Sequence, residues 1–261
     1  MVTPPVRPMV ALVRDVSPSL ADCVLTHLGR VSIDVDRAVF QHQLYCVALQ
    51  DLGACVEAIA PLPDAPDAVF VEDTAVVVDE IAVITRPGVA SRAGETDSAA
   101  VALGRYRPLL RLAEDATLEG GDVMRVGRTL YVGRSGRTNQ AGVDQLGALL
   151  APWGYLVRPV DLRGCLHLKT ACTFVPPHYI LANPAWVDPE IFAGLTAIAV
   201  DEDEPFAANT LTLNGVTLVP SQWPRTAAIL RAHGIHTRDV DLSELAKAEG
   251  ALTCSSVIVE G

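Results

Sequence analysis

A cysteine, a histidine and several carboxylates occur where polar residues interrupt strand-like apolar stretches. Cys254 lies in Leu252-Thr-Cys-Ser-Ser256, and His167 lies in Leu166-His-Leu-Lys-Thr170. A cysteine attacks as a thiolate, so it needs a cation or a hydrogen-bond donor nearby. A histidine can move protons near neutral pH. We therefore predict nucleophilic catalysis with Cys254 as the nucleophile and His167 as its acid/base partner, with a hydrogen-bonded core histidine as the alternative for His167.

Carboxylates in apolar surroundings indicate a cationic ligand. Glu72 and Asp73 lie between Val69-Phe70-Val71 and Ala75-Val76-Val77, where unpaired charges would be costly. A planar guanidinium suits such carboxylates because its donors match them two at a time. A metal ion is the alternative, but the sequence contains no HExxH motif and no paired-histidine spacing. His27, His42, His178, His233 and His236 are interpreted as exposed.

Two arginines are candidates for binding an anionic group. Arg137 lies in Gly133-Arg-Ser-Gly-Arg-Thr-Asn139, a glycine-rich turn that enters a predicted helix. Arg92 follows Arg86-Pro-Gly88. Ordinary surface positions remain the alternative for both arginines.

Composition narrows the class of protein. The formal net charge is −11 in 261 residues, which argues against a nucleic-acid partner and fits a cationic small molecule. No apolar run is long enough for a membrane span, and no secretory signal is evident, so we expect a cytoplasmic protein. The six cysteines show no zinc-ligand spacing. All but Cys254 are interpreted as small, buried apolar residues.

The polar interruptions form a weak internal repeat. They recur about every 41–49 residues, a period that is typical of arrays and propellers. A strand follows each one, and after the first four that strand turns back as a hairpin. Asn214-Gly215, in the fourth hairpin, is a strong turn signal. The five interruptions are 70–74, 118–122, 166–170, 207–210 and 252–256.

Helical patterns complete the repeating unit. Residues 36–52, 139–151, 224–233 and 243–248 have helical spacing or capping residues. The unit reads strand–strand–helix–strand, five times. The last unit ends with one strand, 256–260, which the N-terminal strand at 9–14 can complete. We predict an α/β fold: a single catalytic domain, 1–261, forming a five-bladed propeller with pseudo-fivefold symmetry, closed by the N- and C-terminal strands. The polar interruptions would then converge on the central axis, which would receive Glu72, Asp73, Glu119, Asp122, His167, Asn209 and Cys254. An ordinary α/β sandwich is the alternative.

These motifs resemble one family across nearly the whole chain, from about residue 12 to the C-terminus. The sequence is similar to the dimethylarginine dimethylaminohydrolases of the pentein superfamily. The matching stretches are Gln41-His-Gln-Leu-Tyr45, Pro66-Asp-Ala-Val-Phe-Val-Glu-Asp73, Ile84-Thr-Arg-Pro-Gly88 with Ser91-Arg92, Leu118-Glu-Gly-Gly-Asp-Val123, Arg137-Thr-Asn-Gln140, Leu166-His-Leu-Lys169, Ala207-Ala-Asn209 and Gly250-Ala-Leu-Thr-Cys-Ser-Ser256.

The resemblance implies the same fold and a role for each matching residue. Cys254 corresponds to the nucleophile, His167 to the proton donor, and Glu119 to the carboxylate that holds the imidazole and the guanidinium. The other implied contacts are with the substrate. They comprise the carboxylates Asp67, Glu72 and Asp73, the arginines Arg92 and Arg137 at the amino-acid end, and backbone contacts at Leu20, on a lid, and at Ala248.

The implied reaction hydrolyses asymmetric dimethylarginine or monomethylarginine to citrulline and dimethylamine or methylamine. It proceeds through a covalent thiouronium on Cys254 and needs neither a metal nor an organic cofactor. The expected ligand is a small methylated arginine, and neither a nucleic acid nor a membrane is expected as a partner. The chain is expected to be a monomer or a homodimer. Three alternatives remain: another guanidine substrate such as arginine or agmatine, a non-catalytic binding protein for arginine-like ligands, and a metal-dependent hydrolase.

Overall fold

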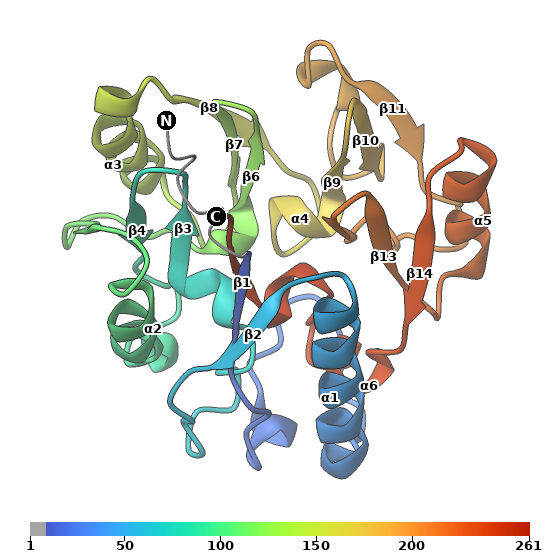
Figure 1. The fold of residues 1–261 in the computed structure, drawn as a ribbon, viewed down its shortest axis with the longest axis horizontal. Helices are drawn as coiled ribbons and strands as arrows, with labels where there is room; N and C mark the ends of the chain where they lie inside the picture. Colours follow the sequence, from blue (N-terminus) through green and yellow to red (C-terminus); the bar gives the residue numbers. More distant parts are fainter. Residues whose placement is uncertain (1–8) are drawn as a thin grey trace, which may run out of the picture.

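Five small sheets are arranged in a ring (Figure 1). The computed structural model describes residues 9–261. Each sheet has three strands. They are β15 (Val257–Val259), β1 (Val10–Val13) and β2 (Cys55–Ala58); β3 (Ala75–Val77), β4 (Ala82–Ile84) and β5 (Leu109–Arg111); β6 (Val123–Val126), β7 (Thr129–Arg134) and β8 (Leu156–Asp161); β9 (Cys172–Val175), β10 (Tyr179–Ala182) and β11 (Thr196–Ala199); and β12 (Leu211–Leu213), β13 (Val216–Pro220) and β14 (Thr237–Val240).

All five sheets have the same topology. The middle strand pairs antiparallel with one neighbour and parallel with the other, as β4 does with β3 and β5. In the first sheet β1 takes the middle place, antiparallel to β15 and parallel to β2. The register sets Val10 opposite Val259, so the two ends of the chain meet in one sheet. The predicted five-bladed α/β propeller, closed by its terminal strands, is confirmed.

Helices connect the parallel strands in four of the five units. They are α1 (Val35–Asp51), α2 (Glu95–Leu103), α3 (Gln140–Leu150) and α5 (Pro224–Ala232). Side chains cap two of them: Asp34 accepts from the Arg37 amide, and Asn139 accepts from the Gly142 amide. The repeating unit implies a helix between β10 and β11 as well, although no helical pattern was found there, and the connection contains only the 3₁₀ turn η6 (Pro189–Ile191). Two prolines in Asn183-Pro-Ala-Trp-Val-Asp-Pro189 prevent a longer helix there.

The polar interruptions are short helical turns that precede the first strand of a sheet. They are η2 (Val71–Thr74), η4 (Gly120–Asp122), α4 (Leu168–Ala171) and η7 (Thr253–Ser255), while residues 207–210 form a turn without a helix. Side-chain hydrogen bonds join them: Asn209 donates to Thr253 Oγ1 at 3.0 Å and to the Lys169 carbonyl at 3.1 Å. Thr253 Oγ1 donates to Glu72 at 2.8 Å, and the Gly121 amide donates to Asp73 at 3.0 Å, so the predicted convergence of the five segments is confirmed.

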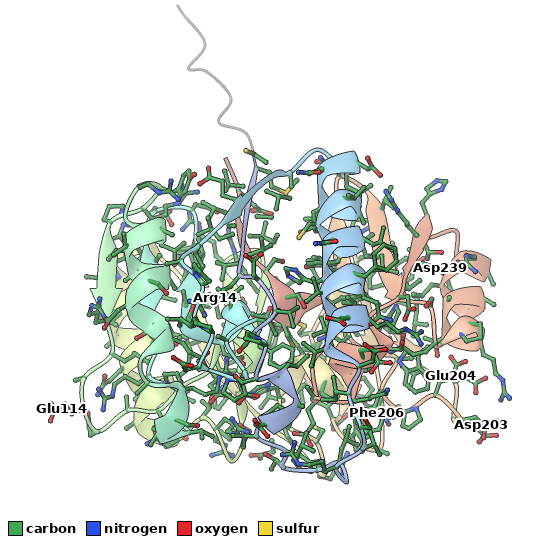
Figure 2. All side chains as sticks on the ribbon, turned by 90° about the horizontal axis from the view of Figure 1, so that it is seen from below. Arg14, Glu114, Asp203, Glu204, Phe206 and Asp239 are labelled. Carbon is green, nitrogen blue, oxygen red and sulfur yellow. The ribbon has the colours of Figure 1, made fainter. Side chains whose placement is uncertain are left out.

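Buried polar groups fix the loops near these turns. Arg14, at the end of β1, is fully buried (Figure 2). Its guanidinium donates to the carbonyls of Ala68 and Glu95 at 2.7 and 3.0 Å. These bonds connect the start of the chain with the segment that carries Asp67 and with α2 (Glu95–Leu103).

Three sequence interpretations were wrong about exposure. His42 is buried, because it belongs to the inward face of α1 (Val35–Asp51) together with Ala38, Tyr45 and Leu49. Burial lowers the pKa of His42 to about 4, although Asp15 opposes the shift. Cys55 is exposed and Cys46 is half-buried, whereas the other cysteines are buried as expected.

Candidate active site

A small cavity at the centre of the ring collects most of the predicted site residues. Its lining includes Asp67, Asp73, Arg92, Arg137, His167, Ala248 and Cys254. These side chains come from segments spread over the whole sequence, and the convergent turns η2, α4 and η7 bring three of them together. The structure therefore places a thiol, an imidazole, carboxylates and guanidinium groups around one buried space.

Glu119 is fully buried and holds the imidazole. The His167 Nε2 and Glu119 Oε2 atoms lie 2.7 Å apart. The other oxygen of Glu119 accepts from the Gly88 amide at 3.0 Å and from the Arg137 guanidinium at 3.3 Å. This carboxylate connects the predicted proton donor with a predicted substrate-binding arginine.

The surrounding charges set the protonation of His167. Burial alone would lower its pKa, but the carboxylates of Asp73, Asp122 and Glu119 outweigh that effect and raise the pKa to about 9. His167 is therefore an imidazolium at neutral pH, the form that can donate a proton.

The pKa of the Cys254 thiol is also raised, but for a thiol a higher pKa favours the uncharged form. Burial raises the pKa of Cys254 well above that of an ordinary thiol, and the carboxylates of Glu72 and Asp73 raise it further. In the absence of a ligand, Cys254 is a neutral thiol. A cation bound in the cavity would favour the thiolate.

Asp73 and Arg92 form a buried ion pair. Their closest atoms, Asp73 Oδ2 and Arg92 Nη1, lie 2.6 Å apart. Arg92 also contacts both oxygens of Glu95 and the Phe70 carbonyl. Burial opposes ionisation of Asp73, but His167 and Arg92 outweigh it and lower the pKa of the carboxyl. Arg92 lines the cavity, and protein acceptors already contact each of its three nitrogens.

Glycine at position 121 allows the turns to pack. A Cβ atom there would lie 2.6 Å from His167 Nδ1 and 2.9 Å from Asp73 Oδ1. The Gly121 amide instead donates to Asp73 Oδ1 at 3.0 Å. The absence of a side chain thus brings η4 (Gly120–Asp122) close to both functional groups.

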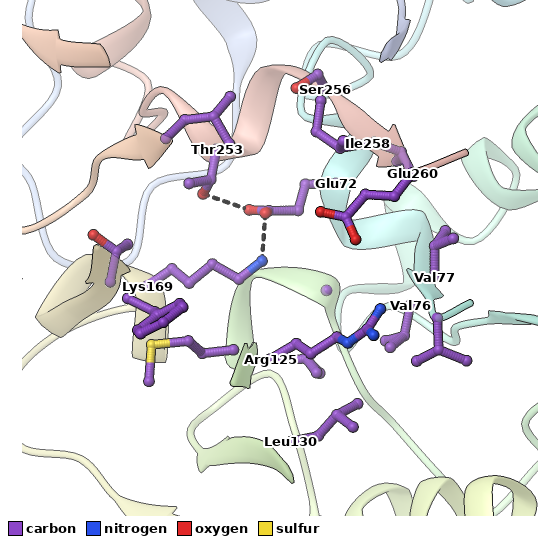
Figure 3. Close-up of a pocket in the computed structure, with 18 of the residues that line it drawn as sticks. Glu72, Val76, Val77, Arg125, Leu130, Lys169, Thr253, Ser256, Ile258 and Glu260 are labelled. Carbon is purple, nitrogen blue, oxygen red and sulfur yellow. Dashed lines mark hydrogen bonds and ion pairs between the residues drawn. The ribbon is translucent and has the colours of Figure 1, made fainter. Parts of the chain in front are cut away.

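Glu72 points into a different cavity (Figure 3). One of its carboxylate oxygens pairs with the Lys169 ammonium, and the other accepts from Thr253 Oγ1 at 2.8 Å. On two of the turns, neighbouring residues therefore face different cavities. Asp73 and Cys254 line the first cavity, whereas Glu72 and Thr253 line the second. The predicted contact of Glu72 with a substrate stays a prediction, and this geometry places Glu72 beside Cys254 rather than in its cavity.

Leu20 and Ala248, the two residues predicted to contact the substrate through their backbone, lie in different parts of the structure. Ala248 lines the cavity, as expected of a residue with a backbone contact. The Leu20 side chain is fully buried in the core, and its carbonyl accepts from the Cys23 amide at 3.0 Å. Val24, not Leu20, lines the cavity, and the Val24 amide donates to Asp67. The role of Leu20 stays a prediction.

One group of side chains has the composition of a metal site. Among residues 9–261, only Asp73, Glu119 and His167 bring three suitable donor atoms within 4.8 Å of one another. These same atoms already contact Arg92, Gly121 and each other, so the protein's own donors satisfy them. The predicted absence of a metal requirement is left to experiment.

Two residues of the site had no assigned role in the sequence prediction. Glu249 lines the cavity between Ala248 and Gly250. Asp122, expected only to lie near the axis, accepts from the Leu168 amide at 3.0 Å and from two hydroxyls, of Ser135 and Thr138. It fixes the turn that carries His167. The sequence signal for Asp122 was its place in the polar interruption Leu118-Glu-Gly-Gly-Asp122. No local sequence pattern distinguishes Glu249 from a surface carboxylate.

None of the helices in the part of the chain that the structure describes is long and apolar enough to cross a membrane. No family model matches the sequence.

Individual proteins match it closely. A protein of Streptomyces coelicolor named N(G),N(G)-dimethylarginine dimethylaminohydrolase is 39% identical over 95% of this chain and 95% of its own length. The structure of the Pseudomonas aeruginosa enzyme, a mutant complexed with citrulline, has a TM-score of 0.90 and 34% identity and covers 95% of this chain and 98% of that one. A dimethylarginine dimethylaminohydrolase variant solved as an adduct with S-methyl-L-thiocitrulline has a TM-score of 0.91 and 33% identity, covering 97% of this chain and 100% of that one. The chain belongs to the dimethylarginine dimethylaminohydrolase family.

Proposed function

We propose that this protein hydrolyses Nω-methylated free arginine, as asymmetric dimethylarginine or monomethylarginine, to citrulline and dimethylamine or methylamine. The observation that carries the proposal is the cavity that Cys254 lines together with His167, the carboxylates Asp67 and Asp73 and the Arg137 guanidinium, while Glu119 holds the imidazole of His167 from behind. The names and bound ligands of the related proteins support the substrate class.

The first half-reaction forms a covalent intermediate. The Cys254 thiolate attacks the central guanidinium carbon, and a C–S bond forms as the C–N bond to the methylated nitrogen breaks. His167, an imidazolium at neutral pH, gives its proton to the departing amine. A thiouronium remains on Cys254. Asp73 lines the cavity with Cys254 and can accept from the guanidinium, because its lone pairs are not exhausted by Arg92 and Gly121.

The second half-reaction releases citrulline. Neutral His167 takes a proton from water, and the hydroxide oxygen attacks the same carbon. The C–S bond then breaks, the sulfur leaves with the bonding pair, and the proton of the added hydroxyl passes to that sulfur, which leaves the carbonyl of citrulline and a neutral Cys254 thiol. The Glu119 carboxylate stabilises the imidazolium that re-forms, since its oxygen lies 2.7 Å from Nε2. The buried site limits competing water in the first step.

Arg137 is the better placed of the two arginines for the amino-acid carboxylate. Its guanidinium contacts Glu119 at 3.3 Å and Thr26 Oγ1 at 3.0 Å, which leaves donors for a ligand. Arg92 is more strongly occupied by Asp73 and Glu95. Asp67, which lines the same cavity, would accept from the substrate ammonium group.

The test is citrulline release from asymmetric dimethylarginine, with arginine and agmatine in parallel, by the wild type and by Cys254→Ala. We expect turnover of the methylated substrate that the substitution abolishes. Activity in Cys254→Ala would overturn the nucleophile. Turnover of agmatine alone would overturn the amino-acid substrate, and loss of activity on dialysis against a chelator would favour a metal-dependent hydrolase through Asp73, Glu119 and His167.

A further inference from the structure

A loop of twelve residues borders the cavity of Cys254 on one side. This segment, residues 23–34, which we term the lid, connects η1 (Leu20–Asp22) to α1 (Val35–Asp51) and contains no helix or strand. Val24, near its start, lines the cavity. The middle of the lid, around Thr26 and His27, is exposed to solvent.

The side chain of Glu249 holds the middle of the lid. Its carboxylate accepts hydrogen bonds from three consecutive backbone amides, those of Thr26 at 3.0 Å and of His27 and Leu28 at 2.6 Å each. Consecutive amides that converge on one anion form a strong anion-binding arrangement. Each bond joins two residues that are more than two hundred positions apart in the sequence, so the three bonds fasten the lid to the last segment of the chain.

Apolar packing holds the ends of the lid but not its middle. Cys23 is buried in a hydrophobic core, and Leu25 and Ile33 pack against that core. Residues 27–31 instead adjoin a cavity of about 450 Å³, whose lining includes Leu28 and Val31 of the lid together with Trp223 and Leu242. Val31 is 55% exposed. Because the middle of the lid does not rest on a filled core, polar bonds decide whether it stays closed.

The backbone at Glu249 is shaped for this contact. Glu249 has a φ of 60°, in the left-handed region that residues with a Cβ atom seldom adopt. Glu249 and its neighbour Ala248 both line the cavity of Cys254. An unusual conformation kept at the edge of a reactive site is typical of a functional constraint.

We propose that Glu249 is a positioning residue for the reaction, which latches the lid over the bound substrate through the amides of residues 26–28. The proposal rests on the proposed function for its kinetic consequence, but the latch itself is a property of the free protein. Two of the predicted substrate-binding residues contact the same segment: Asp67 accepts from the Val24 amide, and Arg137 donates to Thr26 Oγ1. Closure and substrate binding therefore use the same short stretch of chain.

The substitution to test is Glu249→Gln, which keeps the size of the side chain but removes the negative charge. We expect KM for the methylated arginine to rise about tenfold while kcat changes less than about twofold, because the bonds hold the lid rather than the reacting atoms. Glu249→Asp keeps a carboxylate and should recover part of the loss. Glu202→Gln is the matched control, since it makes the same charge change at an exposed position.

Two measurements on the protein without substrate separate the latch from the chemistry. Trypsin should cut after Arg30, an exposed lid residue, several-fold faster in Glu249→Gln than in the wild type. Alkylation of Cys254 by iodoacetamide, followed on its peptide by mass spectrometry, should also accelerate. Thermal midpoints of the two proteins should agree within about 2 °C, which excludes general destabilisation.

The outcomes are distinct. Unchanged cleavage after Arg30 and unchanged alkylation in Glu249→Gln would overturn the latch, whatever the kinetics show. Faster cleavage with unchanged KM would overturn its role in positioning. If the wild type turned over no guanidine substrate, the proposed function would fail, while cleavage and alkylation would still decide whether Glu249 holds the lid.

Discussion

Buried carboxylates raise the pKa of both His167 and Cys254, with opposite consequences for their charge. Asp73, Asp122 and Glu119 outweigh the burial of His167 and keep it protonated, with a pKa of about 9. Burial, together with Glu72 and Asp73, raises the pKa of Cys254 and keeps it a neutral thiol. A substrate guanidinium would change this balance. A unit charge about 4 Å from the sulfur contributes about 4 kcal/mol at an effective dielectric constant of about 20, which is about 3 pKa units. The substrate would thus offset most of the shift and favour ionisation of the thiol that attacks it.

A titration at 240 nm tests this coupling. In the free protein we expect no thiolate absorbance from Cys254 at neutral pH, since a raised pKa delays ionisation until the solution is strongly alkaline. The signal is the difference between the wild type and Cys254→Ser, which cancels the other five thiols. A non-hydrolysable guanidinium ligand should bring the absorbance change to lower pH. A thiolate already present at neutral pH without ligand would disprove the coupling.

At the scale of the elements, the short turns determine which side chains meet. Gly121→Ala tests this, because the added Cβ atom would lie 2.6 Å from His167 Nδ1. We expect His167 to shift and citrulline release to fall about 100-fold, as misplacement of a catalytic group by about 1 Å would predict. Circular dichroism should remain that of the wild type.

Gly94→Ala is the control for that substitution, since nothing lies within 4 Å of a Cβ atom there. Activity of Gly121→Ala within threefold of the wild type would show that the turns tolerate more movement than their packing implies.

Some features of these elements could be predicted from the sequence and others could not, for physical reasons. The hairpins and the polar interruptions have local signals, such as Asn214-Gly215, so their order and convergence could be predicted. The helical form of the interruptions could not, and it is this form that directs Asp73 and Glu72 to different cavities. The contact of Glu249 with residues 26–28 depends on closure of the whole ring, for which no local pattern exists.

At the scale of the whole molecule, pairing of β1 (Val10–Val13) with β15 (Val257–Val259) closes the ring. Both strands are buried, so deletion of residues 257–261 would leave β1 without its antiparallel partner and expose an apolar edge. The pair corresponds to the hairpin of β6 (Val123–Val126) and β7 (Thr129–Arg134), which differs mainly in having a covalent turn. The site at the centre therefore requires a closed ring, but not a particular place where the chain begins.

A circular permutant makes this testable. A short linker would join residue 261 to residue 9, which lie close together because Val10 pairs with Val259, and new ends would open at Gly127-Arg128 between β6 and β7. We expect a single cooperative unfolding transition, a thermal midpoint lowered by several degrees and retained citrulline release, because every strand keeps the neighbours with which it pairs. The same linker with ends opened between Tyr131 and Val132 breaks the middle strand of a sheet and should not give a folded protein. If both permutants folded equally well, strand pairing would not be what closes the ring. If neither did, the covalent position of the termini would matter as much as the sheet that joins them.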